Sequence, residues 1–358
     1  MPRVSDVKIV AVPRDSNPYQ ELLYQPLRAR EVVVHYAGML TPSRTLNTAL
    51  FPLELVWCRI RGYNIFHLHW TFGFRLPGAG GSTFLLRASR WWFAVLLWLV
   101  GVLGFRVVWT AHNVLPHTPV FDDDVKARRT LVDACDLVIA HTPHALEALA
   151  AIGAKPRRSE VIPLGPYTSE SIRRLLPPAP SGTPTVLYFG QITPHKGVED
   201  LLNVVAALDV APDVIIAGRC MDPTLRKRLV AAAAALQGKV VMSLEYVPEP
   251  DLVKLLAAAD AVVFPFRRVT TSSSVMLGLA AGRVPIIPDL PAFAGLPAAA
   301  VIRYPPGNRG LADALGAVAT MPPETLATMG SAARSAGESV SWDEIAERTA
   351  AAMHDLLG

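Results

Sequence analysis

Short apolar runs alternate with amphipathic stretches through both halves of the chain. In the first half, β-branched and aromatic runs predict strands at residues 7–13, 31–37, 64–70, 105–113, 136–142 and 159–165. The stretches between them have the spacing of helices that bury one face. Apolar runs without polar alternation, each followed by a helix, are typical of a parallel sheet covered on both faces. We therefore expect a doubly wound α/β domain.

The same alternation restarts in the second half, where strands are predicted at residues 185–190, 213–218, 239–247, 261–266, 284–288 and 300–304. Residues 167–184 are rich in Pro, Ser and Gly and are typical of a linker. The expected organisation is one domain over 1–166 and a second over 185–338. Two doubly wound sheets are expected to face each other across a cleft that binds the ligand.

Residues 91–105, WWFAVLLWLVGVLGF, are apolar without interruption. This run is shorter than the roughly 20 residues that span a bilayer. A buried core helix is the first interpretation. The alternative is a helix whose tryptophans Trp91, Trp92 and Trp98, with flanking arginines, contact a membrane surface.

The composition excludes several classes of protein. The chain has 358 residues, of which 51% are hydrophobic and 18% charged, so it is neither disordered nor fibrous. Its net charge is +4, and no basic run with interleaved aromatic residues is present, which disfavours nucleic acid as a partner. Three well-separated cysteines and the lack of an apolar leader predict a reducing, cytoplasmic location.

The loop after the strand at 185–190 is the first candidate for phosphate binding. In YFGQITPHKGVEDLL (188–202), the strand ends at Gly190, a polar loop follows, and a helix begins near Gly197. Backbone amides and the positive end of that helix favour an anion, and Lys196 adds a full charge. The alternative is an ordinary loop with a solvated lysine.

A second candidate lies in FPFRRVTTSSSVMLGLAAGRVPIIP (264–288), where the hydroxyl-rich segment 270–274 precedes an apolar helix. Small hydroxyl residues cap a helix and leave its first amides facing an anion. N-capping alone would account for this segment if it stood by itself. Two such loops in one domain indicate a diphosphate ligand.

The order of these motifs resembles the donor-binding half of GT-B glycosyltransferases of family 4 (group 1). The residues that carry the resemblance are the strand–Gly–x5–Lys–Gly segment ending at Gly197, the strand ADAVVFPF (259–266) and the segment AGRVP (281–285). The resemblance implies the GT-B fold, with two Rossmann-like domains.

The first half continues the resemblance. NPYQELLYQPL (17–27) is similar to the opening loop and helix of bacterial exopolysaccharide-type members, and HLHW (67–70) and WTAHNVLPH (109–117) to their His-x-His and T-x-H-N segments. VIPLGPY (161–167) resembles the sequence before the interdomain linker. The end of the chain, 339–358, resembles the final helix that crosses back to the N-terminal domain.

The resemblance implies a nucleotide-diphosphate-sugar donor in the C-terminal domain and an acceptor in the N-terminal one, with no cofactor and no obligatory metal. By position, Lys196 would contact the diphosphate, and Gln191 stands where the family more often has arginine. The amides of Ser272 and Ser273 would hold the pyrophosphate. The other implied donor-binding residues, near the phosphates, nucleotide or base, are Gly190, Gly218, Arg219, Tyr246, Val247, Thr271 and Ser274.

One departure from the family concerns two glutamates, eight positions apart, that usually contact the donor sugar and the ribose. Val269 and Leu277 occupy those places here, and neither side chain accepts a hydrogen bond. A subgroup with Thr/Ser-Ser-x-Ser in this loop, which includes polysaccharide β-mannosyltransferase-like enzymes, is closer.

Histidines supply the candidate catalytic groups, because a histidine titrates near neutrality and takes a proton from a hydroxyl. His112, at the end of a buried strand, is the first choice, as general base in an inverting reaction or as a partner of the donor sugar in a retaining one. His69 is the second choice and His117 the third. Asp15 is a competing base. The acidic cluster 122–124 is better explained as a solvated helix start.

The acceptor is expected to contact Asn17, Tyr19, Gln20, Asn113 and His117. Histidines could also bind zinc, but no His-Glu-x-x-His segment accompanies them, so no metal site is expected. The predicted function is transfer of a sugar from a nucleotide diphosphate to a hydroxyl of a glycan, a glycolipid or a small molecule, at the inner face of the cell membrane. The alternatives are a sugar-nucleotide 2-epimerase and a non-catalytic subunit that binds nucleotide sugars.

Overall fold

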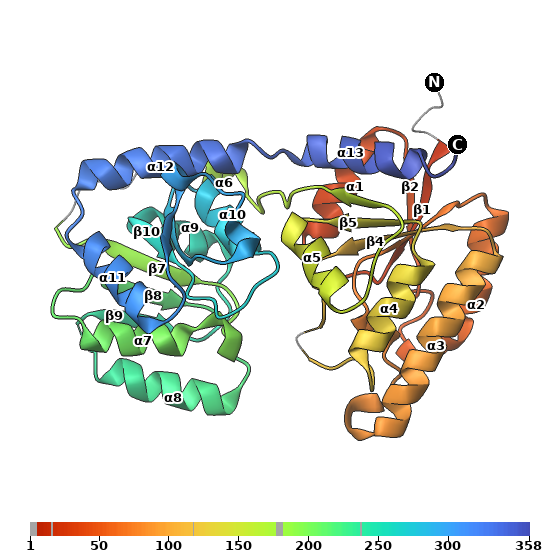
Figure 1. Ribbon diagram of the computed structural model, residues 1–358, viewed down its shortest axis with the longest axis horizontal. Helices are drawn as coiled ribbons and strands as arrows, with labels where there is room; N and C mark the ends of the chain where they lie inside the picture. Colours follow the sequence, from red (N-terminus) through yellow and green to blue (C-terminus); the bar gives the residue numbers. More distant parts are fainter. Residues whose placement is uncertain (1–5, 16, 117, 177–181, 237) are drawn as a thin grey trace. The chain divides into compact units, whose positions relative to one another are not determined.

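A computed structural model describes residues 6–15, 17–116, 118–176, 182–236 and 238–358. The chain divides into two compact units (Figure 1). The first contains Met1–Pro163 and Trp342–Gly358, and the second contains Leu164–Ser341.

The first unit is built on six parallel strands in the order β2-β1-β3-β4-β5-β6. They are β1 (Lys8–Val12), β2 (Val33–Tyr36), β3 (Ile65–Leu68), β4 (Arg106–Ala111), β5 (Leu137–Ala140) and β6 (Ser159–Val161). Its helices are α1 (Tyr19–Ala29), α2 (Arg44–Ile60), α3 (Thr83–Val102), α4 (Asp124–Ala134), α5 (Pro143–Ala151) and α13 (Trp342–His354). The inner strands β3 and β5 are buried at every position, as apolar runs covered on both faces require.

The second unit has its own sheet in the order β12-β11-β10-β7-β8-β9. Its strands are β7 (Thr185–Phe189), β8 (Asp213–Ala217), β9 (Val240–Ser243), β10 (Ala261–Val263), β11 (Val284–Pro288) and β12 (Ile302–Tyr304). Its helices are α6 (Glu170–Arg173), α7 (Val198–Ala207), α8 (Pro223–Ala234), α9 (Glu249–Ala258), α10 (Ser273–Ala280), α11 (Asn308–Ala319) and α12 (Pro323–Glu338). Every strand predicted from the sequence is present, and the predicted doubly wound architecture is confirmed.

The strand order of the second sheet reverses between β7 and β10, which pair with each other. At such a reversal the loops that leave the two strands diverge and make room for a ligand at the carboxyl edge of the sheet. These loops are the two candidate phosphate-binding segments.

The segment expected to be a linker packs on the second unit over its described part. Ile172 of α6 is buried in the core of that unit. A terminal nitrogen of Arg283 donates to the carbonyl of Leu176 at 3.0 Å, and one of Arg334 donates to the carbonyl of Arg173 at 2.6 Å. Residues 177–181 lie outside the described part of the chain.

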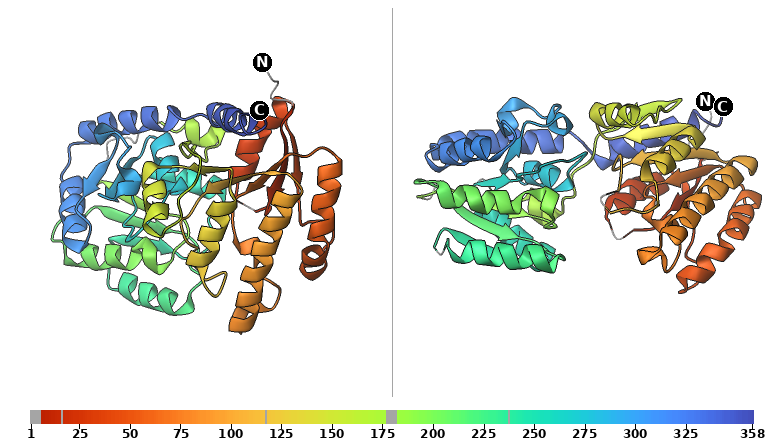
Figure 2. Two further views of the ribbon diagram at one scale, coloured as in Figure 1. Left: turned by 45° about the vertical axis from the view of Figure 1, so that its right-hand side comes forward. Right: turned by 60° about the horizontal axis from the view of Figure 1, so that its bottom comes forward.

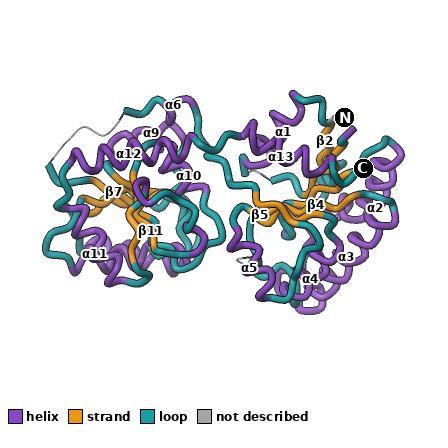
Figure 3. Tube along the Cα trace, turned by 45° about the horizontal axis from the view of Figure 1, so that its top comes forward, coloured by secondary structure: helices purple, strands orange, loops and turns teal. Residues whose placement is uncertain are grey.

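The end of the chain, α13, packs on α1 in the first unit (Figure 3). The ion pair between Arg158 and Asp355, at 3.1 Å, and the hydrogen bond that Arg348 donates to the carbonyl of Val161, at 2.7 Å, hold this segment against the first sheet.

Helix α3 contains most of the apolar run 91–105 and lies beside α2 (Figure 2). One face packs into the core through Phe93, Leu96, Leu97 and Val100. The opposite face exposes Phe84, Trp91, Trp98 and Val102, each more than 60% exposed. Within the described residues, α3 alone is long and apolar enough to cross a membrane, by criteria that core helices of soluble proteins also meet.

Candidate functional site

Six side chains at the carboxyl edge of the first sheet form one continuous series of hydrogen bonds. This histidine chain consists of Thr110, His67, Tyr24, His69, His112 and His141. The histidines lie in or directly after β3, β4 and β5, which are neighbours in the sheet, and Tyr24 comes from α1. All six side chains are buried. The parallel sheet therefore gathers residues from four separate segments, because the carboxyl ends of its strands share one edge.

Tyr24 is the centre of one half of the histidine chain. Its hydroxyl lies 2.8 Å from Nδ1 of His67 and 2.7 Å from Nε2 of His69. Nε2 of His67 lies 2.8 Å from the hydroxyl of Thr110.

His112 is the centre of the other half. Its Nε2 lies 3.2 Å from Nδ1 of His69, and its Nδ1 lies 3.3 Å from Nε2 of His141. Nδ1 of His141 lies 3.0 Å from the carbonyl oxygen of Ile162, where this half ends. The two bonds of His112 are the longest in the histidine chain.

The carbonyl of Ile162 determines the tautomers along this half. A carbonyl only accepts, so His141 carries its proton on Nδ1 and accepts at Nε2. His112 therefore donates from Nδ1 to His141 and accepts at Nε2. The proton in that last bond belongs to Nδ1 of His69.

The same reasoning continues through Tyr24. Since His69 carries its proton on Nδ1, its Nε2 accepts from the Tyr24 hydroxyl. The oxygen of Tyr24 then accepts from Nδ1 of His67, whose Nε2 accepts from Thr110. Four neutral histidines thus satisfy one another with every bond running in one direction.

Burial keeps these histidines neutral. It lowers the pKa of His67 to about 3 and that of His141 to about 4. The pKa values of His69 and His112 lie well below the usual range, first because of burial and then because neighbouring histidines disfavour a second charge. Among the four, His112 is the most exposed, at 8%.

Tyr19 packs against the histidine chain. Its ring centroid lies 4.4 Å from that of His112, nearly perpendicular to it, and 5.3 Å from that of Trp342 in α13. Burial raises the pKa of the Tyr19 hydroxyl, so it stays protonated. The structure brings this predicted acceptor contact together with His112 and His69, as a buried neighbour.

The opening loop uses its polar side chains to hold its own backbone. Oδ1 of Asp15 accepts from the amide of Asn17 at 2.7 Å, and Oδ1 of Asn17 accepts from the amide of Tyr19 at 3.0 Å. Gln20 donates to the carbonyl of Pro13 at 2.8 Å and accepts from the amide of Asp15 at 3.1 Å. These bonds position the start of α1, which carries Tyr24.

A cavity of about 300 Å³, the Trp109 cavity, adjoins the histidine chain in the first unit. Its walls include His69, Trp70, Trp109, Asn113 and Arg128. The predicted acceptor residue Asn113 is therefore near His69, whereas His117 lies outside the described residues. A second cavity of about 310 Å³ has Arg14, Arg44, Phe51 and Trp92 among its lining residues.

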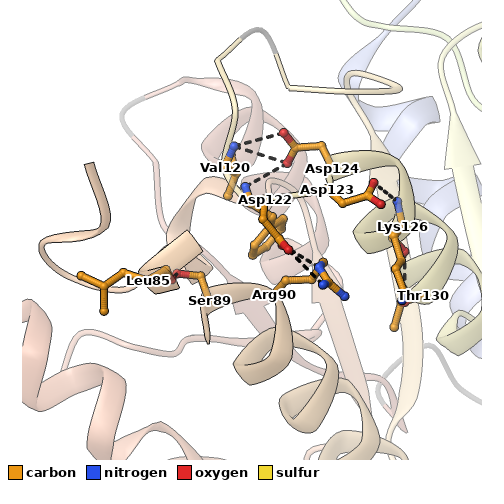
Figure 4. Close-up of polar contacts among 10 residues, drawn as sticks. Leu85, Ser89, Arg90, Val120, Asp122, Asp123, Asp124, Lys126 and Thr130 are labelled. Atoms are coloured by element: carbon orange, nitrogen blue, oxygen red, sulfur yellow. Dashed lines mark hydrogen bonds and ion pairs between the residues drawn. The ribbon is translucent and has the colours of Figure 1, made fainter. Parts of the chain in front are cut away.

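The acidic cluster 122–124 has structural partners (Figure 4). Asp122 makes an ion pair with Arg90 at 2.6 Å, and Asp123 caps α4 by accepting from the amide of Lys126 at 2.8 Å. Asp124 accepts from the amides of Val120 and Phe121. The interpretation of this cluster as the start of a helix is confirmed.

In the second unit, Lys196 ends a short 3-10 turn (Pro194–Lys196) after β7. Its Nζ lies 4.0 Å from the ring centroid of Phe266, and burial lowers the pKa of its ammonium to about 8. The neighbouring acidic residues are engaged elsewhere, Asp200 with Arg267 and Glu199 with Arg228, each at 2.7 Å. In the described part of the chain no carboxylate lies within ion-pair distance of Lys196, so its charge is available to an anion.

The two candidate phosphate-binding loops lie side by side. The amide of Arg267 donates to the carbonyl of His195 at 3.0 Å. A Cβ at Gly190 would lie 3.0 Å from Oγ of Ser274, and one at Gly197 would clash with the carbonyl of Pro265. Gly197 also has φ +71°, which glycine adopts without strain. The close approach of the backbones therefore depends on these glycines.

The start of α10 presents the amides of the hydroxyl-rich segment. Oγ of Ser272 accepts from the amide of Val275 at 3.3 Å, and the amide of Met276 donates to the Ser272 carbonyl at 3.2 Å. The amides of Ser273 and Ser274 come before these first bonds of the helix, at its positive end. Thr271 directly precedes the cap.

The other predicted donor residues follow β8 and β9. Gly218 packs against Gly190, since a Cβ there would clash with the Gly190 carbonyl, and Arg219 next to it is exposed. Gln191 and Tyr246 are exposed, and Val247 is half-buried. At the places of the two family glutamates, Leu277 is buried in the apolar core and Val269 is half-buried against it.

Sequence reasoning missed three residues of these sites: Tyr24, which links the histidines, and the buried pair Trp109 and Arg128. Only the spacing of Tyr24 on the buried face of α1 marked it, and nothing in the sequence pairs it with His67 or His69. Among the described residues, no group of three or more His, Cys, Asp or Glu side chains is arranged to hold a metal ion.

Part of the chain matches a known protein family. Residues 183–319 match the family model described as "Glycosyl transferases group 1". The second unit is a group 1 glycosyltransferase domain. The chain is 30% identical over 231 residues to the GDP-mannose:glycolipid 4-beta-D-mannosyltransferase of Xanthomonas campestris pv. campestris. That match covers 63% of this chain, and it spans about three fifths (61%) of the relative's length.

Solved structures extend the likeness to both units. Sucrose-phosphate synthase from Thermosynechococcus elongatus superposes with a TM-score of 0.74 at 18% identity, covering 98% of each chain. Anabaena HepE in complex with UDP gives a TM-score of 0.68 at 15% identity, covering 98% of this chain and 100% of that one. The group 1 domain thus belongs to a chain with the GT-B fold, as the resemblance implied.

Proposed function

We propose that this protein is a glycosyltransferase that moves a sugar from a nucleotide-diphosphate sugar to a hydroxyl of a glycan or glycolipid. The observation that carries the proposal is the pair of adjoining loops around Lys196 and Ser272. Among the described residues Lys196 has no ion-pair partner, and its loop adjoins the loop that leads into α10, within a group 1 glycosyltransferase domain. A diphosphate leaving group is the ligand that such an arrangement stabilises.

GDP-mannose is the first donor to test, because it is the donor in the name of the relative from Xanthomonas. UDP-sugars are the second, because UDP is bound in the HepE structure. In either case Lys196 and the amides of Ser273 and Ser274 would neutralise the diphosphate without a metal ion. Gly190, Gly218 and Arg219 would surround the nucleotide, and Tyr246 and Val247 would contact the base.

His112 is the proposed catalytic base, and His69 supports it. In the resting tautomer, Nε2 of His112 accepts the Nδ1 proton of His69 across a 3.2 Å bond. Proton transfer from an acceptor hydroxyl to Nε2 requires that this long bond open, while Nδ1 stays bonded to His141. Asp15 is the competing base. We expect His112→Ala to lower kcat far more than donor affinity, and His144→Ala, outside the histidine chain, to change neither.

The acceptor is proposed to be membrane-bound. Phe84, Trp91, Trp98 and Val102 form an exposed stripe along α3, and α2 exposes a second stripe of Leu46, Leu53, Trp57 and Ile60. The one carboxylate of the two helices, Glu54, is buried against His35. Apolar faces accompanied only by exposed arginines suit the anionic inner surface of a cell membrane.

The activity test incubates the full chain with GDP-mannose or a UDP-sugar, with and without a lipid-linked glycan, in the presence of EDTA. Nucleoside diphosphate released only when acceptor is present, with the sugar found on the lipid, supports the proposal. A donor epimerised without acceptor would indicate the 2-epimerase. Binding with no release from any donor would indicate a non-catalytic subunit.

The membrane contact is tested by sedimentation with vesicles that contain phosphatidylglycerol. The double variant Trp91→Ser and Trp98→Ser should lose most vesicle binding and keep its circular dichroism spectrum. A matched variant in the second unit, Met221→Ser with Val241→Ser, removes two equally exposed apolar side chains and should bind as the native chain does. Equal vesicle binding by both double variants would refute the contact through α3.

A further inference from the structure

The Trp109 cavity is lined by two buried side chains, Trp109 and Arg128, that keep hydrogen-bond donors without a partner among the described residues. Nε1 of Trp109, whose side chain is 1% exposed, is a buried polar atom with no hydrogen-bond partner among the described residues. Arg128 is 5% exposed, and of its nitrogens Nε donates to the carbonyl of Val114 at 2.6 Å. Buried polar groups in native proteins are nearly always paired, so an unpaired indole N–H on a residue that lines a cavity points to a missing ligand.

The two donors are close enough to act on one ligand. The guanidinium carbon of Arg128 lies 4.3 Å from the centroid of the Trp109 ring. Both side chains line the same cavity of about 300 Å³, together with His69, Asn113 and Thr118. A cavity of this size holds a sugar ring or a phosphate group with room for water.

The carboxylates near Arg128 have other partners. In the loop before α4, Asp122 makes an ion pair with Arg90, and Asp123 accepts a hydrogen bond from the amide of Lys126 (Figure 4). The oxygens of Asp124 accept hydrogen bonds from the amides of Val120 and Phe121. Asp124 attracts the guanidinium of Arg128 but makes no ion pair with it within the described residues. Burial lowers the pKa of Arg128 to about 10, so the buried side chain still carries its charge at neutral pH.

We propose that the Trp109 cavity binds an oxyanion, a carboxylate or a phosphate, carried by the acceptor. An indole N–H and a guanidinium only donate, so the ligand must bring acceptor oxygens, and a negative charge compensates the buried cation. A water molecule would satisfy the indole but would leave Arg128 without an ion-pair partner among the described residues. The recognised acceptor is thus an acidic sugar or a lipid phosphate.

The location of the cavity fits an acceptor better than a donor. His69 lines the cavity and donates to His112, so an anion bound there lies next to the proposed catalytic base. The donor diphosphate is assigned to the second unit. This inference rests on the proposed function only in naming the acceptor as the carrier of the anion, because binding in the cavity requires no nucleotide.

The indole N–H itself reports on occupancy. The full chain, labelled with 15N-tryptophan, gives seven indole resonances, and Trp109→Phe identifies the one from Trp109. We expect that resonance to shift on titration with methyl β-glucuronide, with dodecyl phosphate or with both, and to stay in place with the neutral methyl β-glucoside. A shift with the glucuronide alone identifies a sugar carboxylate, and one with dodecyl phosphate alone identifies a lipid phosphate.

Variants of Arg128 test the charge. Arg128→Gln should weaken anion binding by about tenfold or more, and Arg128→Lys by less, because the lysine keeps the charge but not the fork of donors. Arg129→Gln, in the next position of α4 and exposed, is the matched control and should bind as the native chain does. If Arg128→Gln fails to fold, the comparison of Arg128→Lys with the native chain decides the matter.

Two results would overturn the inference: no shift of the Trp109 resonance with either anion, or an equal shift with the neutral glucoside. Either result leaves the proposed sugar transfer standing if nucleotide sugars still bind and turn over. Conversely, loss of nucleotide binding with an intact anion-dependent shift contradicts the proposed function and retains the anion site.

Discussion

The histidine chain of the first unit and the two candidate phosphate-binding loops of the second unit differ in whether their polar groups have partners. In the histidine chain, every ring nitrogen has a partner inside the protein, and burial keeps all four rings neutral. In the candidate phosphate-binding loops, the ammonium of Lys196 lies over the face of Phe266 and has no ion-pair partner among the described residues, and the first amides of α10 precede the bonds of the helix. The histidine chain satisfies its own polar groups, whereas the loops keep a positive charge that an anion would balance.

This contrast distinguishes a site that holds its own residues in position from a site that is suited to bind a ligand. A saturated network holds its members rigidly and resists protonation, which suits groups that must keep one tautomer until a substrate displaces a bond. A site whose donors lack partners becomes more stable only when a ligand binds, which suits recognition of a diphosphate. The Trp109 cavity resembles the loops in this respect, although it adjoins the histidine chain.

Acidification should affect the histidine chain most. The folded pKa values lie below the value of about 6.5 in the unfolded chain, so the unfolded state binds more protons as the pH falls. The stability that neutrality provides is complete above pH 6.5 and is lost below it. By linkage we expect a loss of about 1.4 kcal/mol for each histidine between pH 7.5 and 5.5, or about 5 kcal/mol for the four.

Urea denaturation at a series of pH values measures this loss. His141→Gln should reduce the slope of stability against pH, whatever it does to stability at pH 7.5. His354→Gln, which removes a histidine outside the histidine chain, is the matched control. A native chain equally stable at pH 7.5 and 5.5 would show that the four rings are not held neutral.

Forcing the two candidate phosphate-binding loops apart should have the second largest effect on the free energy of unfolding. Gly197→Ala places a methyl group against the carbonyl of Pro265 at a backbone conformation that alanine disfavours, so we expect a loss of about 2–4 kcal/mol in the free energy of unfolding. Gly238→Ala is the matched control, because its φ is +87° and its Cβ would meet nothing within 4 Å. It should lose about 1 kcal/mol, from strain alone. Equal losses in the two variants would mean that the loops tolerate separation.

Removing the unpaired charge should weaken donor binding about 10- to 100-fold. Lys196→Ala deletes the one cation proposed to contact the diphosphate, and charge-assisted hydrogen bonds have this magnitude. Calorimetric titration with GDP-mannose or GDP measures the change, and Lys227→Ala, an exposed lysine of α8, serves as the control. Unchanged affinity in Lys196→Ala would remove this residue from the donor site.

The smallest effect concerns pH. With a pKa of about 8, Lys196 is about nine-tenths charged at pH 7 and about one-tenth charged at pH 9. Donor affinity should therefore fall by up to about tenfold over this range. Lys196→Arg keeps its charge at pH 9 and should flatten the profile, so a native chain whose affinity is constant from pH 7 to 9 contradicts the role of a titrating lysine.

The sequence predicted all twelve strands because each lies in a short run rich in apolar residues, a pattern that local composition expresses directly. The inner strands β3 and β5 are buried at every position. The sequence also identified Lys196 and the segment 270–274, since a strand end followed by a polar loop and a helix is a local signal. The sequence did not identify Tyr24, Trp109 and Arg128 as site residues. Their roles depend on the distance between side chains from α1, β3, β4 and α4, which no local pattern encodes.

By itself, then, the order of apolar runs and loop residues determined the two doubly wound sheets and the family resemblance, because burial of strands and capping of helices are properties of neighbouring residues. The tertiary structure alone decided which histidine holds which proton and which buried donors lack partners. Hydrogen-bond direction passes from Ile162 to His141 and onward across three strands, and it exists only when the sheet brings those strands into register.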